Sequence, residues 1–161
     1  MEGNLDEKDV ARPIIGVPPP LIALLLLGVG LAVHSMFPAH IFPGPWIQFV
    51  AGAPFILLGL FVASTALQTL KGAGTDDRFA RPTIVIVEQG PYARSRNPMY
   101  LAVILIFLGV AFALNGLWVL AMIPALFLYF NFGVIPYEER YLERRFGDQY
   151  RSYKSRVRRW I

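Results

Sequence analysis

The residues with the clearest capacity for chemistry lie in two short polar segments, and each segment borders a long apolar run. Residues 90–100 read GPYARSRNPMY, and residues 137–140 read YEER. Arginines supply cations, glutamates supply carboxylates, and tyrosines supply aromatic faces that attract cations. Concentrated at one mouth of an apolar helix bundle, these groups indicate a site for a polar ligand.

The first polar segment predicts the start of a helix. Asn is a favoured N-cap and Pro is favoured at the first helical position, so Asn97-Pro98 should begin a helix. The free N–H groups of a helix start attract anions, and Arg94 and Arg96 directly precede this one. The alternative is that both arginines only extend to lipid phosphates at a membrane surface.

The second polar segment adds carboxylates. Glu138 and Glu139 lie on an otherwise basic face, so they are either ion-pair partners or anchors for a ligand. Tyr92, Tyr100 and Tyr137 place aromatic rings around the same mouth, where they suit a cation such as a sulfonium. A ligand with a carboxylate, an amine, a sulfonium and a ribose would use every group in the two segments.

The apolar runs predict an all-α integral membrane protein. The 161 residues are 55% hydrophobic and 16% charged, and the mean hydropathy is +0.49. Residues 13–70 and 97–136 contain no Asp, Glu, Lys or Arg, and each stretch can hold two crossings of about 20 residues. A soluble bundle would need a charged face on each helix, which is lacking. We therefore predict four transmembrane helices at residues 19–37, 46–69, 98–114 and 117–135.

Turn signals and basic residues set the arrangement of these spans. Asn115-Gly116 interrupts the second apolar stretch, so spans three and four should form an antiparallel hairpin whose open ends meet at one surface. All fifteen Lys and Arg residues lie before span one, between spans two and three, or after span four. The positive-inside rule then places both termini, the middle loop and the polar site on the cytoplasmic side of a cell membrane. Anionic lipid, and no nucleic acid, is the expected partner of the basic tail.

The chain should form a single domain over residues 1–161. Its expected parts are an acidic N-terminal tail (1–18), a first helical hairpin (19–69), a cytoplasmic loop (70–97), a second helical hairpin (98–136) and a C-terminal interfacial helix (137–161). The leading segment is acidic and has no small-residue cleavage site. The first span is therefore expected to remain as an anchor, unlike a signal peptide.

Several kinds of chemistry are excluded by composition. The chain has no cysteine, which excludes disulfides, thiolate metal sites and cysteine nucleophiles. His34 and His40 are the two histidines, and both lie around the turn between spans one and two, away from every Asp and Glu. Neither a metal site nor a Ser-His-Asp triad is predicted.

The C-terminal segment carries a helical apolar stripe. Its members recur at steps of four, four, three and four: Leu142, Phe146, Tyr150, Tyr153 and Val157. Gly147 is expected to bend or break this amphipathic helix. We expect the stripe to lie in the membrane interface with Trp160 as an aromatic anchor, either as a fixed anchor or as a lid over the site.

The two polar segments also carry a family resemblance. The matching residues are Gly90-Pro91-Tyr92 followed by Arg96-Asn97-Pro98-Met99-Tyr100, and Glu138-Glu139-Arg140-Tyr141-Leu142 running into Phe146-Gly147, Tyr150 and Tyr153. Over roughly residues 71–161 the chain resembles the integral-membrane methyltransferases related to isoprenylcysteine carboxyl methyltransferase and the phospholipid N-methyltransferases. The resemblance implies S-adenosyl-L-methionine as cofactor, bound on the cytoplasmic side between spans three and four and the polar tail. Asn97 departs from the His that the isoprenylcysteine branch often carries, which leaves the substrate branch open.

The resemblance also implies roles for individual residues. The expected cofactor-binding residues are Gly90, Tyr92, Arg96, Asn97, Pro98, Tyr100, Tyr137, Glu138 and Glu139, and the expected catalytic residues are Arg96 and Glu139. Arg96 and the helix start would bind the cofactor carboxylate, and Glu138 or Glu139 would bind its amine or its ribose. A carboxylate or thiolate acceptor needs no general base, whereas an amine would lose its proton to one glutamate. The acceptor is expected to be a hydrophobic small molecule or a lipidated substrate that enters from the bilayer.

Two other classes of protein remain as alternatives. One is a membrane NAD(P)H-dependent reductase of the sterol-reductase type, for which the lack of a G-x-G-x-x-G element discriminates poorly. The other is a small four-span transporter or scaffold, although a transporter should carry an ionisable residue in mid-membrane and these spans carry none. Gly28, Gly52 and Gly59 permit close helix contacts within one chain or between chains, so they leave the oligomeric state open.

Overall fold

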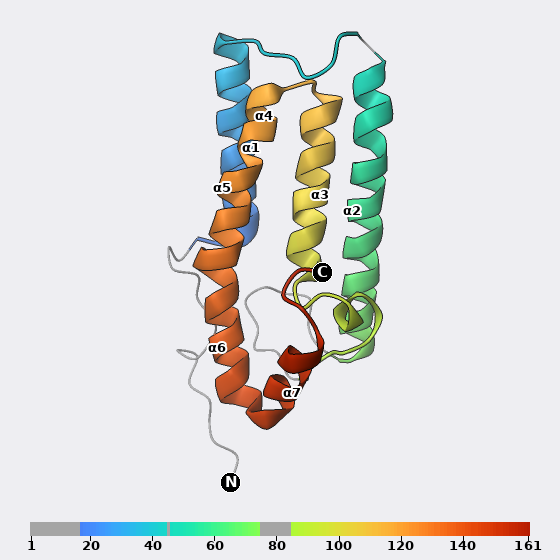
Figure 1. Ribbon diagram of the computed structural model, residues 1–161, viewed down its shortest axis with the longest axis vertical. Coiled ribbons are helices and arrows are strands. Elements are labelled where there is room, and N and C mark those ends of the chain that lie inside the picture. The colour runs from blue at the N-terminus through green and yellow to red at the C-terminus, as the bar shows by residue number, and fades with distance from the viewer. Residues whose placement is uncertain (1–16, 45, 75–84) are drawn as a thin grey trace.

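The computed structural model describes residues 17–44, 46–74 and 85–161, and these residues form helices and connections without a strand (Figure 1). An all-α fold is thus confirmed for the described part of the chain. Most of the predicted acidic tail and the centre of the predicted cytoplasmic loop, residues 75–84, lie outside it.

Apolar helices run side by side to form a bundle. They are α1 (Pro19–Met36), α2 (Ile47–Gly72), α3 (Pro98–Ala113) and a continuous column of α4 (Leu117–Ala121), α5 (Ile123–Leu128), the π-helix η3 (Tyr129–Val134) and α6 (Ile135–Phe146). Three of them, namely α1, α2 and the column, are long and apolar enough to cross a membrane. The 16 residues of α3 give a length of about 24 Å, somewhat less than the hydrocarbon core of about 30 Å.

Glycines allow α2 and α3 to pack closely. A Cβ atom built on Gly52 would lie 2.6 Å from the carbonyl oxygen of Gly109, and one built on Gly109 would lie 2.7 Å from the carbonyl oxygen of Gly52. Gly59 contacts α3 in the same way, one site further along α2. Small residues let helix backbones approach in a membrane. Gly52 and Gly59 therefore form contacts within the chain. Through these contacts α2 fixes the position of α3, whose start lies at the polar end.

Asn115 joins the helix ends that are remote from the charged segments. Its φ of 52° lies in the left-handed region, which Asn tolerates better than most residues. The side-chain oxygen accepts hydrogen bonds from the backbone N–H groups of Ile41 and Phe42, each at 2.8 Å, and Nδ2 donates to the Phe42 carbonyl at 3.0 Å. The turn predicted at Asn115-Gly116 is confirmed, and it also fixes the connection between α1 and α2.

The core lies where α3 meets the helical column. Phe107, Val119, Leu126 and Phe130 are buried there. The Tyr100 ring packs on Phe130 with centroids 4.8 Å apart, so the core reaches the polar end of α3. In contrast, α1 and α2 expose many large apolar side chains on their outer faces. Such a surface is unfavourable in water and suits contact with lipid.

The C-terminal segment is divided into two helices. The chain turns at Gly147, whose φ is 53°, and continues as α7 (Asp148–Arg156). In Figure 1, α7 folds back below α3. The tyrosines of α7 and Val157 are buried together against Ile86. The predicted apolar stripe therefore packs on the protein itself instead of facing a membrane interface.

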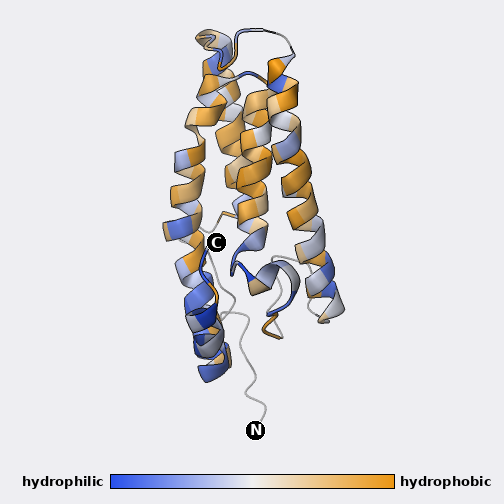
Figure 2. Ribbon diagram, turned by 45° about the vertical axis from the view of Figure 1, so that its right-hand side comes forward, coloured by the Kyte–Doolittle hydropathy of each residue, from blue (hydrophilic) through white to orange (hydrophobic). Residues whose placement is uncertain are grey.

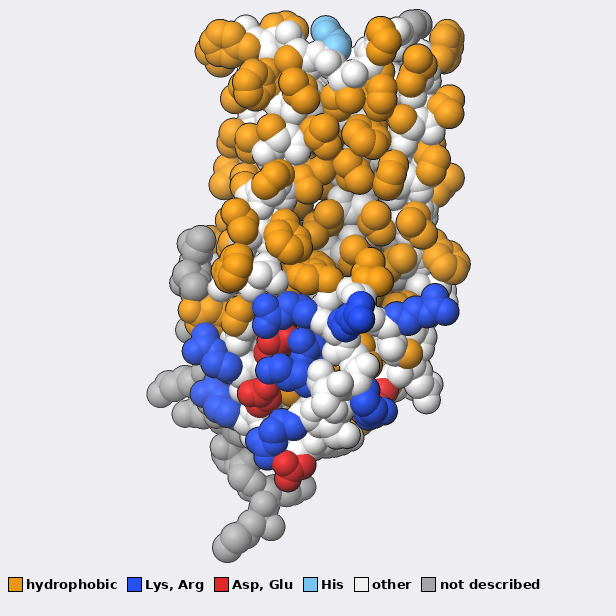
Figure 3. Space-filling view, in the orientation of Figure 1, with side chains coloured by type: hydrophobic (Ala, Val, Ile, Leu, Met, Phe, Trp, Pro, Cys, Tyr) orange, Lys and Arg blue, Asp and Glu red, His pale blue; other side chains and the backbone are white. Residues whose placement is uncertain are grey.

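Polarity is segregated along the long axis of the molecule. The helices are hydrophobic over most of their length and hydrophilic at the end that carries α6 and α7 (Figure 2). On the face seen in Figure 3, Lys, Arg, Asp and Glu side chains gather at that end, below a wide apolar belt. The two polar segments predicted to form a site thus lie at the same end of the bundle.

Candidate active site

Three basic side chains converge on the buried carboxylate of Glu139. Arg96 places Nη2 at 3.1 Å from Oε1 of Glu139. Arg159 donates from Nε to Oε1 at 3.1 Å and from Nη2 to Oε2 at 2.7 Å. The Nζ atom of Lys154 lies 4.0 Å from Oε2. The structure thus brings the predicted pair Arg96 and Glu139 together, and it adds Arg159, which the predicted set lacks.

While the neighbouring Glu138 is protonated, this cluster has an excess of positive charge. Arg96, Lys154 and Arg159 contribute three positive charges, while Glu139 and Glu143, which lies 2.7 Å from Lys154, contribute two negative charges. The Arg96 side chain is only 9% exposed, and its Nε and Nη1 atoms have no hydrogen-bond partner among the described residues. Buried donors of this kind are costly unless an acceptor completes them. An anion fits this position.

Glu138 lies beside the cluster and is held differently from Glu139. The hydroxyl group of Tyr100 donates to Oε1 of Glu138 at 2.6 Å, whereas guanidinium groups occupy both oxygens of Glu139. The apolar part of the column ends at Ile135, so Glu138 lies beyond the membrane-spanning segment. Burial raises the pKa of Glu138 to about 7; the Tyr100 hydrogen bond opposes this rise and the charge of Glu139 adds to it. Glu138 therefore changes its charge near neutral pH.

Tyrosines form a wall next to the cluster. The Tyr153 hydroxyl donates to the backbone carbonyl of Tyr92 at 2.8 Å, and this bond ties α7 to the short 3₁₀ helix η2 (Gly90–Ala93). Burial raises the pKa of Tyr92 and of Tyr150. Burial also raises the pKa of Tyr153 to about 12, although the Arg96 charge opposes the rise. These phenols stay neutral at physiological pH, so they offer aromatic faces and hydrogen bonds and do not act as bases.

Residues 157–161 hold the start of α3 in place. The Arg96 backbone N–H donates to the Arg158 carbonyl at 3.0 Å, and Nδ2 of Asn97 donates to the Arg159 carbonyl at 2.9 Å. The predicted helix start at Pro98 is confirmed, with Asn97 at the N-cap position. The predicted cap by the Asn97 side chain is wrong, since that side chain makes no cap hydrogen bond. Its amide instead joins two segments that are distant in sequence.

Asn131 completes the attachment of the C-terminal segment. Its side-chain oxygen accepts hydrogen bonds from Nε1 of Trp160 at 3.1 Å and from Nη1 of Arg159 at 3.4 Å. The Trp160 ring packs on Phe127, with centroids 5.1 Å apart, so it contacts the protein instead of serving only as a membrane anchor. Asn131 lies in η3, and π-helical turns often occur at functional positions. A sequence signal existed, because Asn131 is the one amide side chain in residues 117–135.

Other predicted residues border the cluster or lie apart from it. Gly90 has a φ of +57°, and a Cβ atom there would lie 2.7 Å from the Thr69 hydroxyl, so this turn requires glycine. The ring of Tyr137 is covered by the Arg140 guanidinium, 4.3 Å from its centroid. The Tyr137 ring therefore packs on Arg140 and lies apart from the contacts of Arg96.

Comparison with known proteins identifies the family of this chain. The family model described as phospholipid methyltransferase matches residues 47–149, which contain α2, α3, the helical column and both predicted polar segments. The chain belongs to the phospholipid methyltransferase family. The resemblance inferred from the two polar motifs is confirmed, and membrane methyl transfer is the activity class of this family.

A relative of this phospholipid methyltransferase family member occurs in Haemophilus influenzae. It is an uncharacterized protein that is 41% identical over 63 residues, which cover 39% of this chain and 100% of the relative. No solved structure matches the chain. The enzyme class thus follows from the family match.

Proposed function

We propose that the protein transfers a methyl group from S-adenosyl-L-methionine to a lipid-borne or hydrophobic acceptor, as isoprenylcysteine carboxyl methyltransferase does. The observation that carries this proposal is the buried Arg96 guanidinium, which has two free donor atoms in a cluster with excess positive charge. The cofactor contains a carboxylate, and a guanidinium binds a carboxylate through parallel hydrogen bonds. Arg96 is the residue that would hold it.

The two glutamates would divide the remaining work. Glu139 is engaged by Arg96 and Arg159, so its role is to position the Arg96 guanidinium. Glu138 is engaged through one oxygen by Tyr100 and is better suited to accept hydrogen bonds from the cofactor amine or ribose. This division assigns Glu138 the binding role and gives Glu139 an indirect one.

When bound, the cofactor supplies a methyl group activated by a sulfonium sulfur. The protein contributes by binding both reactants in line, since positioning lowers the barrier of a displacement reaction. The neutral rings of Tyr92 and Tyr100 offer aromatic faces to a cation. If the acceptor is an amine, Glu138 is suited to take the released proton, because a base works best with a pKa near the operating pH.

The proposed membrane arrangement has four spans, with α3 as the short one. Every described Lys and Arg side chain belongs to the last turn of α2, to the loop after it or to residues beyond Ile135, and Figure 3 shows this basic end beneath the apolar belt. The positive-inside rule then supports a cytoplasmic location for the basic end, the candidate site and both termini of a multi-pass cell-membrane protein. Membrane lipid is the immediate environment of the acceptor.

A binding experiment on the purified protein tests the proposal. Isothermal titration calorimetry with S-adenosyl-L-methionine and, separately, with NADPH distinguishes a methyltransferase from the reductase alternative, which the family match does not favour. Binding of the first ligand alone is expected. Incubation of membranes with methyl-labelled cofactor, followed by lipid extraction, should then yield a labelled acceptor. Binding of NADPH without binding of S-adenosyl-L-methionine would overturn the proposal.

A further inference from the structure

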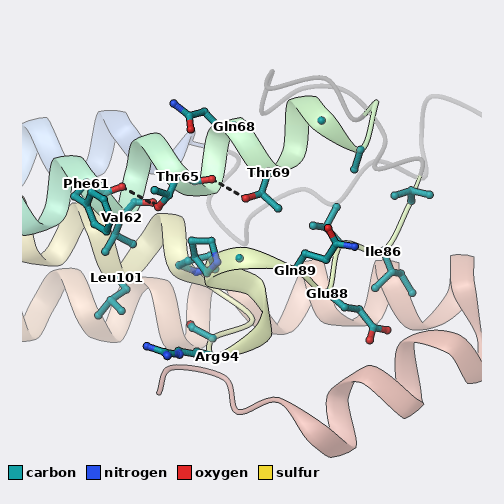
Figure 4. A pocket seen from close by; sticks show the side chains of 18 of the residues that line it. Phe61, Val62, Thr65, Gln68, Thr69, Ile86, Glu88, Gln89, Arg94 and Leu101 are labelled. Atoms are coloured by element: carbon teal, nitrogen blue, oxygen red, sulfur yellow. Dashed lines mark hydrogen bonds between the residues drawn. The ribbon is translucent and has the colours of Figure 1, made fainter.

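A large pocket opens beside the loop that carries Arg96. It has a volume of about 1230 Å³ and lies between the C-terminal half of α2, residues 85–91 and the start of α3 (Figure 4). Ser95 contributes to its wall, while Arg96 and Glu139 do not. The pocket is therefore a neighbour of the candidate active site and separate from the charged cluster.

The wall of this pocket changes from apolar to polar along α2. Phe61 and Val62 of α2 and Leu101 of α3 line the end nearer the middle of the bundle. Gln68 and Thr69, about two helical turns further along α2, line the end at the basic surface. The change coincides with the border between the apolar belt and the charged end of the molecule. An amphiphile of the membrane has the same order of chain and headgroup.

One cation in the wall is not neutralised. Arg94 is exposed, and its side chain makes no ion pair or hydrogen bond within the described part of the chain. Figure 4 shows its side chain extending toward Leu101. The carboxylate in the wall, Glu88, is already bound by Arg156, with Oε2 2.8 Å from Nη2. The pocket thus combines an apolar wall with an available guanidinium.

We propose that this pocket binds one membrane lipid with an anionic headgroup. The lipid phosphate lies at Arg94, and an acyl chain lies against Phe61, Val62 and Leu101. A water-soluble phosphate compound would leave the apolar wall uncovered, and a zwitterionic lipid would bring a cation toward Arg94 as well as a phosphate. Both halves of the pocket are satisfied by an anionic amphiphile.

This inference does not depend on the proposed methyl transfer. The bound lipid has one of two roles. It is the methyl acceptor itself, or it is an unmodified lipid that holds residues 90–95 beside Arg96. The recognition chemistry is the same for both.

Native mass spectrometry of the purified full chain tests the site. The protein is titrated with phosphatidylglycerol and, separately, with phosphatidylcholine that carries the same acyl chains. The parent protein should bind one phosphatidylglycerol in preference to phosphatidylcholine. Arg94→Gln should weaken phosphatidylglycerol binding by about tenfold or more, as expected for one lost hydrogen bond to a charged group. Arg144→Gln removes another exposed arginine, one outside this pocket, and should leave binding unchanged.

The apolar half of the pocket is tested with a matched pair of bulky substitutions. Val62→Trp fills the pocket, whereas Leu58→Trp places the same ring one turn away on α2, outside the pocket wall. Only Val62→Trp should abolish retention of the lipid. Circular dichroism is used to check that both variants fold. Equal phosphatidylglycerol binding by the parent, Arg94→Gln and Val62→Trp proteins would overturn the inference.

Two further readouts separate this inference from the proposed function. Calorimetry with S-adenosyl-L-methionine on the same samples tests the methyltransferase alone, so loss of cofactor binding with intact lipid binding refutes only that proposal. After incubation of whole membranes with methyl-labelled cofactor, label in the lipid that copurifies with the protein identifies this lipid as the acceptor. Retained lipid without label identifies it as the unmodified lipid.

Discussion

Arg96 carries a permanent charge in a place where its hydrogen-bonding capacity is not met. Two of the three buried side-chain atoms that lack a partner among the described residues are its Nε and Nη1, and the third is Nδ1 of His34. A guanidinium cannot relieve this cost by losing its proton. The carboxylate of Glu139 is shared with Arg159, so it compensates Arg96 only in part. A ligand anion is the simplest missing partner.

Replacement of Arg96 tests that role directly. Arg96→Gln should weaken S-adenosyl-L-methionine binding by about 1.5–3 kcal/mol, the usual effect of losing a hydrogen bond to a charged group. Calorimetry measures the change. Arg151→Gln is a matched control, because that arginine pairs with Asp148 at the surface and is 61% exposed. An Arg96→Gln protein that is folded and binds as tightly as the control would remove Arg96 from the site.

Glu138 predicts a pH dependence of cofactor binding. Its pKa of about 7 lies above the ordinary value because burial disfavours the carboxylate. If the ionised form accepts hydrogen bonds from the cofactor, affinity is full above about pH 8 and declines as the pH is lowered through 7. Titrations at several pH values check this. Glu138→Gln should bind more weakly at high pH and lose the dependence in this range. A parent protein with constant affinity from about pH 6 to 8 contradicts the assignment.

The different roles of the two glutamates could not be predicted from the sequence. Glu138 and Glu139 are adjacent in one motif and both face the polar end. They differ because Arg159 reaches back to Glu139 from the C-terminal segment, and that approach depends on the turn at Gly147. A contact between residues 20 positions apart leaves no local signature.

Helices that depend on local signals were predicted well. Pro98 begins α3 and Asn115-Gly116 ends the hairpin, because proline and left-handed turns constrain the backbone directly. The C-terminal segment was predicted less well. Its apolar period was correct, but periodicity does not tell whether a stripe packs on lipid or on protein, and here it packs on Ile86.

The glycine contact between α2 and α3 should be sensitive to a single methyl group. In Gly52→Ala, the new Cβ would lie 2.6 Å from the Gly109 carbonyl oxygen and 2.8 Å from the Ala113 nitrogen. Both neighbours are backbone atoms that cannot move alone, so we expect destabilisation by about 1–3 kcal/mol. Gly28→Ala is the control, since nothing lies within 4 Å of its Cβ position. Thermal unfolding in detergent should separate the two variants, and equal midpoints would contradict the close packing.

Asn131 links the π-helix to the C-terminal segment. Asn131→Leu removes the acceptor for Trp160 and Arg159 and should loosen the attachment of residues 157–161 by about 1–3 kcal/mol. Trypsin cleavage after Arg158 and Arg159 should become faster, and Trp160 fluorescence should shift to longer wavelength. Phe132→Leu, at a neighbouring position that is 62% exposed, should change neither. Unchanged cleavage in Asn131→Leu would show that other contacts hold the segment.

At the scale of the whole molecule, charge and apolar surface divide the protein into two zones. The basic end, which Figure 3 shows below the apolar belt, contains the cluster around Arg96 and Glu138 and the proposed lipid pocket. The opposite end contains the turn around Asn115. The proposed sulfonium cofactor is water-soluble, and the proposed lipid acceptor is not. A site at the border between the zones would give each of these proposed reactants access from its own phase.

The direction of this axis across the membrane is the last prediction. The positive-inside rule favours a cytoplasmic basic end, so single cysteines at the two ends should react from opposite sides of intact cells. The chain has no native cysteine, which makes each introduced thiol unambiguous. Ser155→Cys in α7 and His40→Cys in the turn between α1 and α2 are exposed positions. A membrane-impermeant maleimide should label His40→Cys in intact cells and Ser155→Cys only after the membrane is permeabilised. Labelling of both thiols from outside would contradict the proposed topology. Labelling of Ser155→Cys alone would invert it, and the cofactor site would then face away from the cytoplasm that supplies S-adenosyl-L-methionine.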